Sequence, residues 1–157
     1  MATKTFSAKA SVRGPYHDIK AIKKLIYDTL KNDSTLTGLL GASTSVYHYF
    51  PQTKDIKHPA IFYNIISEET YPYDENDKNS SLTGIVFGID IVDDSPNASR
   101  SDDIENRIFQ LFNGKMLKDS DVVFKHPCRR TYYFQFYDTE IRVWRTVMRF
   151  TTVTAPI

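Results

Sequence analysis

The sequence contains a single cysteine, Cys128, among 157 residues. One cysteine cannot form a disulfide within the chain, so a disulfide-stapled scaffold is excluded and a reducing compartment is the simple interpretation. Apolar runs are short, and none approaches the ~20 residues of a membrane-spanning helix. Residues 1–18 also lack the apolar segment of a secretory signal. We therefore expect no membrane partner.

Catalytic signatures are missing as well. The sequence has no GxGxxG, GxxxxGK[ST] or GxSxG motif. His126 and Cys128 are two residues apart and would share one face of a strand, but no CxxC or HxxxH accompanies them. Asp90, Asp93 and Asp94 fit a strand that runs into an acidic turn. We predict no enzyme, no cofactor and no metal site.

The net charge is also small. The sequence has 20 Lys and Arg and 19 Asp and Glu, which leaves a formal charge of +1. A protein that mainly binds the phosphate groups of nucleic acid usually carries a larger net positive charge. The charges are nevertheless segregated: residues 1–31 and 125–149 are mainly basic, and residues 66–95 are mainly acidic. Such segregation either is an accident of a solvated surface or pairs one subunit with the next.

Hydrophobic periodicity predicts two helices. Ile19, Ile22, Leu25, Ile26 and Leu30 recur at helical spacing within residues 16–33. A short turn over 34–41, which Ser34 can cap, follows this helix. The second helix is predicted at about 99–113, where Gly114 can end it. We interpret residues 1–16 as a flexible arm and residues 17–157 as a single domain.

The remaining segments alternate as strands do, at 46–50, 60–66, 83–92, 121–125, 130–137 and 140–153. Residues 68–81 form a long acidic loop that we expect to be mobile in an isolated subunit. The order of elements predicts an α+β fold, with two helices on one face of an antiparallel sheet in which mixed pairing stays open. The predicted core comprises Ile22, Leu25, Ile26, Phe87, Ile89, Ile104, Ile108, Phe134 and Trp144.

Aromatic residues and arginines gather in the segment 129–150, "RRTYYFQFYDTEIRVWRTVMRF". In its first strand Tyr132, Phe134 and Phe136 share one face, and in its second strand Arg145 and Arg149 share one face. Arginines beside aromatic rings can form a stacking platform for nucleic acid. They are equally typical of a protein–protein surface. The alternation already uses the aromatic residues for packing, which favours the second interpretation.

Several degenerate motifs follow one another along residues 17–152. The segment "LIYDTLKNDSTLTGLLG" (25–41) leads to "VYHYFPQ" (46–52), "HPAIFYNII" (58–66) and the helical "IENRIFQLFNG" (104–114). In this order and spacing the chain resembles the tail-completion or tail-terminator proteins of long-tailed bacteriophages. The arm and the long acidic loop depart from the short pattern of that family.

The resemblance implies a structural protein of the virion, assembled in the cytoplasm of the bacterial host. Members form a ring, typically a hexamer, at the head-proximal end of the tail tube, where the ring ends tube growth and docks the neck. The implied partners are further copies of the chain, the tail tube protein, a neck or head-completion protein and, in a contractile tail, the sheath protein. DNA passes through the lumen without being read. A head–tail adaptor subunit and a nucleic-acid-binding module that uses the 129–150 hairpin are the alternatives, and an enzyme ranks third.

Charge complementarity suggests where subunits meet. The second strand of the hairpin carries the arginines Arg142, Arg145 and Arg149, and the acidic segment carries Glu68, Glu69, Asp74, Glu75 and Asp77. A head-to-tail contact places one of these patches against the other in the next subunit, and repetition closes a ring. We therefore predict that Arg145 or Arg149 meets an acidic residue of a neighbour or of the tube. A solvated strand face is the alternative.

Overall fold

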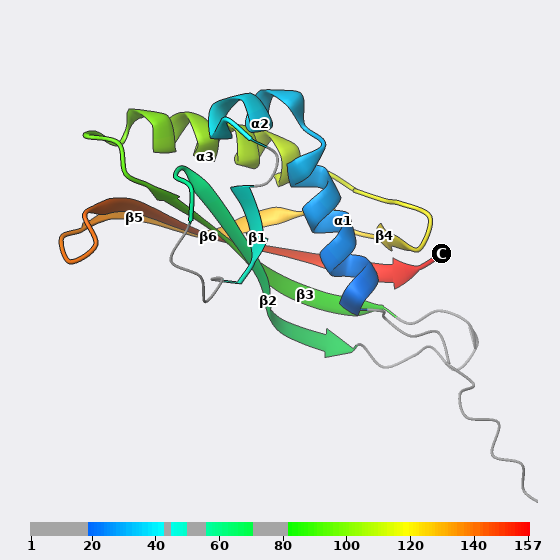
Figure 1. The fold of residues 1–157 in the computed structure, drawn as a ribbon. Coiled ribbons are helices and arrows are strands. Elements are labelled where there is room, and N and C mark those ends of the chain that lie inside the picture. The colour runs from blue at the N-terminus through cyan, green and yellow to red at the C-terminus, as the bar shows by residue number, and fades with distance from the viewer. Residues whose placement is uncertain (1–18, 43–44, 50–55, 71–81) are drawn as a thin grey trace, which may run out of the picture.

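The computed structural model describes residues 19–42, 45–49, 56–70 and 82–157. The predicted arm over residues 1–16 lies outside the described residues, and so does the acidic loop beyond residue 70. The fold is shown in Figure 1, where the three helices lie on one side of the sheet.

The first helix, α1, spans Ile19–Lys31, and its apolar positions face the core. A second helix, α2, spans Ser34–Leu40, a segment that was predicted to be only a short turn. Asp33, rather than the predicted Ser34, caps α2, because its carboxylate accepts a hydrogen bond from the Leu36 amide at 2.8 Å. Gly41 ends α2 with a φ of 77°, in the left-handed region that glycine adopts without a steric penalty.

The third helix, α3, spans Ser99–Phe112 and buries Ile104, Ile108 and Phe112. Arg107 of α3 donates from Nε to the Asp33 carboxylate at 2.9 Å, which ties α3 to the start of α2. Arg130 pairs with Glu105 and ties α3 to the sheet. Among the described residues, no helix is long and apolar enough to cross a membrane.

Six strands form the sheet, in the order β1-β2-β3-β6-β4, with β5 also paired to β6. Their bounds are Val46–His48 (β1), Ala60–Thr70 (β2), Thr83–Asp93 (β3), Val122–Phe124 (β4), Arg129–Asp138 (β5) and Val143–Pro156 (β6). β5 and β4 pair with successive parts of the long strand β6. β1 runs parallel to β2, and every other pairing is antiparallel.

The predicted fold class was wrong in its layers. Three helices, not two, cover the sheet, because the segment 34–40 gains a side-chain cap and forms a helix of its own. The sheet is mixed, a pairing that the sequence left open, because β1 pairs in parallel with β2. It curls strongly beneath the helices in Figure 1.

The main core lies between the helices and the sheet. Phe87 stacks on Phe150 with ring centroids 5.4 Å apart, and Phe112 of α3 closes on both rings. Of the nine predicted core residues, seven are buried there, and Leu25 is only 5% exposed. Phe134 was predicted wrongly, since it is 51% exposed, and Trp144 is half-buried.

A bulge in β5 explains the error at Phe134. The register passes from Arg130 opposite Phe150 to Tyr132 opposite Arg149, so Thr131 is an extra residue in the ladder. One inserted residue moves every following side chain to the other face of a strand. The row of Tyr132, Phe134 and Phe136 therefore points away from the helices.

Candidate functional site

The face of the sheet opposite the helices is the candidate site, and we call it the outer face. No helix among the described residues covers it (Figure 1). Its centre is built from β5, β6, β3 and β2, where the register aligns Phe134 with Val147 and Val147 with Asp90. One part of this face is buried, since Ala60, Phe62, Val92 and Val143 form a second apolar cluster there, and the part around Tyr132, Phe134 and Arg149 is exposed.

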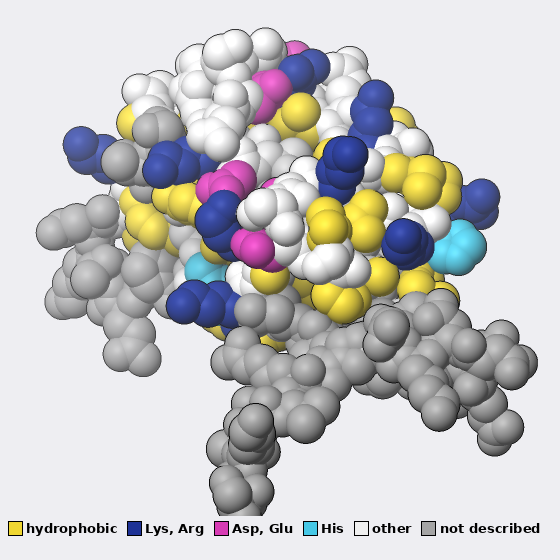
Figure 2. Space-filling view, turned by 90° about the vertical axis from the view of Figure 1, so that its right-hand side faces the viewer, with side chains coloured by type: hydrophobic (Ala, Val, Ile, Leu, Met, Phe, Trp, Pro, Cys, Tyr) yellow, Lys and Arg dark blue, Asp and Glu magenta, His cyan; other side chains and the backbone are white. Residues whose placement is uncertain are grey.

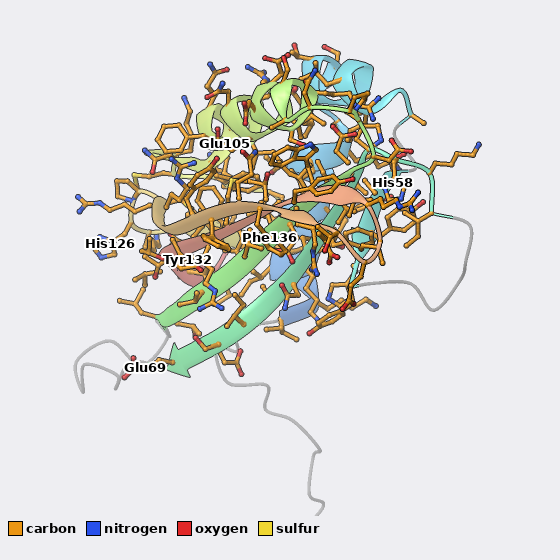
Figure 3. All side chains as sticks on the ribbon, turned by 90° about the vertical axis from the view of Figure 1, so that its left-hand side faces the viewer. His58, Glu69, Glu105, His126, Tyr132 and Phe136 are labelled. Atoms are coloured by element: carbon orange, nitrogen blue, oxygen red, sulfur yellow. The ribbon has the colours of Figure 1, made fainter. Side chains whose placement is uncertain are left out.

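An aromatic row runs along β5 at one margin of the outer face. Tyr132 and Phe134 are 44% and 51% exposed, and the rings of Phe134 and Phe136 lie 5.5 Å apart. Figure 3 shows Tyr132 and Phe136 on the side of the sheet away from Glu105 of α3. Exposed rings gathered on one strand commonly mark a surface that another molecule covers.

Two arginines of β6 lie beside this row, each over one of its rings. The Arg149 guanidinium carbon is 5.1 Å from the centre of the Tyr132 ring, and that of Arg145 is 5.8 Å from the centre of the Phe136 ring. Both distances fall within the range of cation–π attraction. The rings thus fix the two cations on the outer face.

The two arginines differ in their other neighbours. Arg145 is about one-quarter exposed, and its Nη2 lies 3.9 Å from the Asp90 carboxylate of its own chain. Burial raises the pKa of Asp90, and the charges of Arg145 and Arg149 oppose that rise. Arg149 is exposed. Arg149 is therefore the better placed of the two for an acidic partner outside the chain.

A shallow depression of about 290 Å³ adjoins the arginines, lined by Asn64, Ile66, Gly88, Asp90, Val147, Met148 and Arg149. Gly88 forms its floor. A Cβ atom at Gly88 would come within 2.9 Å of Asn64 Oδ1 and 3.1 Å of Ile66 Cδ1. The glycine therefore lets the side chains of β2 fold over β3.

Two of the predicted acidic residues lie at the far end of β2, where Figure 3 shows Glu69 near the tip of the strand. A bulge between Ile65 and Ser67 places Glu69 opposite Gly84 and Glu68 opposite Ile85. Gly84 belongs to the outer face and Ile85 to the core face, so Glu69 rather than Glu68 is turned to the outer face. Both glutamates are exposed.

The other predicted residues are not brought to the outer face by the described structure. Arg142 lies in the turn before β6, not in the strand as predicted, with a φ of 56°. Asp74, Glu75 and Asp77 lie outside the described residues. Of the predicted set, Arg145, Arg149 and Glu69 lie on the outer face, with Glu69 near the end of β2 and apart from the two arginines.

Sequence reasoning missed the helix-facing side of the hairpin. Arg130, which pairs with Glu105, also lies over the rings of Phe109 and Tyr133, at 4.4 and 5.0 Å from their centres. Gln135 donates to Asp102 at 2.9 Å. The hydrogen bonds from Arg130 to Glu105 and from Gln135 to Asp102 join α3 to β5, and no local motif signals them because the partners are 25 and 33 residues apart.

The cysteine–histidine spacing does not produce a reactive pair. Cys128 is fully buried in the core, and burial raises its pKa to about 12, so the thiol stays protonated at neutral pH. His126 is exposed. Within the described parts of the chain, no group of three or more His, Cys, Asp or Glu side chains could hold a metal ion.

Basic residues also occur elsewhere on the described surface. On the side of the molecule shown in Figure 2, Lys and Arg side chains lie among hydrophobic and acidic ones. The described surface on this side forms no continuous basic patch of the kind that tracks a nucleic-acid backbone.

The similarity of this chain to known proteins lies in its fold. No protein-family model matches the sequence, and no curated protein matches it. Among solved structures, a chain of the virion of a native gene transfer agent (GTA) particle is similar, with a TM-score of 0.69 and 17% sequence identity. The alignment covers 89% of this chain and 98% of that chain. The protein therefore shares its fold, over nearly its whole length, with a chain of a virion.

Proposed function

We propose that the protein is a structural, non-enzymatic subunit of a virion, and that it forms a ring at the head-proximal end of a phage tail tube as a tail terminator. The observation that carries the proposal is the shared fold, which spans 98% of a chain from a gene transfer agent virion. The alignment with that chain covers 89% of this chain.

The resemblance of residues 17–152 to tail-terminator proteins narrows the proposed role. In that role the subunit associates with further copies in a hexamer, with the tail tube protein on one side and with a neck protein on the other. The uncovered outer face supports this, because its exposed aromatic row is an apolar surface suited to a permanent partner. A head–tail adaptor subunit of the same fold is the neighbouring possibility.

Two measurements on the purified protein test the proposed ring. Light scattering coupled to size-exclusion chromatography gives the number of subunits, and negative-stain electron microscopy gives the shape of the particle. The expected result is a particle of about six subunits with a central opening. A protein that stays monomeric at all concentrations, also in the presence of tail tubes, contradicts the ring. Capping of tubes of limited length by the added protein supports the terminator role over the adaptor role.

A second measurement distinguishes the proposed ring from the alternative, a nucleic-acid-binding module that uses the 129–150 hairpin. Fluorescence anisotropy with a labelled single-stranded oligonucleotide detects binding to exposed rings and arginines. We expect weak binding that is independent of sequence and is lost at moderate salt. Tight binding by a monomer that shows no ring in the microscope favours the nucleic-acid module instead.

A further inference from the structure

The outer face carries charges of both signs at separate places. Arg149 lies at the margin formed by β5 and β6, and Glu69 lies at the end of β2. Arg149 lies opposite Gly88 on one side of β3, and Glu69 lies opposite Gly84 on the other side of β3, so the two side chains stand at separate places on the same surface. A surface of this kind complements a second copy of itself when the copy is displaced sideways.

From this arrangement we infer that the outer face at Arg149 and Tyr132 docks the end of β2 of a second copy of the chain, with Glu69 of that copy against Arg149. This inference rests on the proposed ring, and it names the joint between neighbouring subunits. The contact is head-to-tail, because each copy offers the arginine at one place on its outer face and the glutamate at another.

The choice of Arg149 follows from its surroundings. Arg145 already has Asp90 of its own chain 3.9 Å away. Arg149 is exposed and is held over Tyr132, so its stem and the ring offer apolar contact while the guanidinium offers its hydrogen-bond donors. A carboxylate that approaches from another copy meets a cation whose position is already restrained, which lowers the entropy lost on binding.

The choice of Glu69 follows from the bulge in β2. The bulge turns Glu69 to the outer face and Glu68 to the opposite side. Glu69 is exposed near the end of the strand (Figure 3). The same part of β2 also carries the exposed residues Ile66 and Ser67. In the proposed contact they can cover part of the aromatic row of the other copy.

A charge exchange tests the joint. The variants Arg149→Glu and Glu69→Arg each place like charges opposite each other and are expected to lower the fraction of assembled particles at least tenfold. The double variant Arg149→Glu/Glu69→Arg restores the opposite charges and is expected to assemble as the parent does. Sedimentation velocity over a range of protein concentrations measures all four proteins.

Two controls accompany the exchange. Lys20→Glu reverses an equal charge on the exposed side of α1, where an acid in the first turn suits the helix dipole, and its assembly should equal that of the parent. Circular dichroism and thermal melting show that each variant is folded. A variant that unfolds is replaced by Arg149→Gln or Glu69→Gln, for which we expect weaker but measurable loss of assembly.

The outcomes separate this inference from the proposed ring. Rings that persist in folded Arg149→Glu, or a double variant that assembles no better than the single ones, overturn the joint and leave the ring standing. A parent that never forms a particle overturns both. Oligonucleotide binding that depends on Arg149 and is unaffected by Glu69→Arg assigns the outer face to nucleic acid and overturns the joint.

Discussion

At the scale of single residues, Asp93 shows how a buried charge is accommodated in this fold. Its side chain is fully buried at the end of β3, and it accepts hydrogen bonds from Arg100, the Ser95 amide and Ser101. Burial alone would raise the pKa of Asp93, but the hydrogen bonds from Arg100 and Ser95 outweigh it and hold the pKa below its usual value. The carboxylate therefore stabilises the folded protein when it is ionised.

This residue gives a prediction about acid stability. The folded pKa of Asp93 is depressed, so its contribution is present above the unfolded pKa of about 4 and is lost as the pH falls through the folded value. Asp93→Asn should lower the free energy of unfolding at pH 7 by about 1–3 kcal/mol, because it weakens bonds to a charged group. Urea unfolding at pH 7 and at pH 3 measures both effects.

The loss should shrink at pH 3, because this pH lies below the unfolded pKa of about 4, where the stabilisation that comes from the depressed folded pKa of Asp93 is being lost. Asp94→Asn is the matched control, because Asp94 also pairs with Arg100 but is 57% exposed. Its effect should stay within about 0.5 kcal/mol, as is usual for surface positions. Equal losses for the two variants would contradict a special role for Asp93.

At the scale of elements, α2 depends on a residue outside its own helix. Asp33 caps α2 through the Leu36 amide and also receives two hydrogen bonds from Arg107 of α3. The Arg107 side chain, through its hydrogen bonds to the carboxylate, lowers the pKa of Asp33, which keeps the cap ionised. A seven-residue helix is too short to be stable alone, so this cap and the buried Leu36 and Leu40 hold it.

Two substitutions at Asp33 separate the cap from the ion pair. Asp33→Ala removes both and should lower the free energy of unfolding by about 2–3 kcal/mol. Asp33→Asn keeps a capping oxygen for the Leu36 amide but loses the charge, so it should cost less, about 1 kcal/mol. Chemical denaturation of both variants at pH 7 gives the comparison. If Asn costs as much as Ala, the ion pair rather than the cap governs α2.

At the scale of the whole molecule, the two faces of the sheet differ in what covers them. One face is sealed by three helices, while the other presents rings and arginines to its surroundings. The apolar rings and the Arg149–Glu69 pair would respond to salt in opposite ways, since salt screens charges and strengthens apolar association. The salt dependence of assembly therefore reports which of them governs the proposed ring.

We predict that the concentration needed for assembly rises between 0.05 and 0.5 M NaCl, because the screening length falls from roughly 14 to 4 Å over that range. The double variant Arg149→Gln/Glu69→Gln, in which both side chains are neutral, is the matched control. Its assembly should depend much less on the NaCl concentration. Light scattering at several protein concentrations gives both curves. Assembly of the parent that strengthens steadily with NaCl would argue for a contact made by the rings alone.

Local patterns in the sequence determined much of the subunit. The helical spacing of Ile22, Leu25 and Ile26 and the alternation of β3 and β6 predicted which residues share a face, and the structure confirms these groupings. Such groupings follow from the geometry of each element, 3.6 residues per turn or two per repeat, which the chain carries without reference to its neighbours. The arginines Arg145 and Arg149 were placed on one face in this way.

Only the tertiary structure decided which face points inward. The bulge at Thr131 turns the row of Tyr132, Phe134 and Phe136 away from the helices, and the bulge after Ile65 selects Glu69 over Glu68. The parallel pairing of β1 and the cap that Asp33 supplies to α2 were likewise outside the reach of local patterns. A bulge is a mismatch between two strands, so it depends on the register of a partner far away in the sequence and leaves no periodic trace in its own strand.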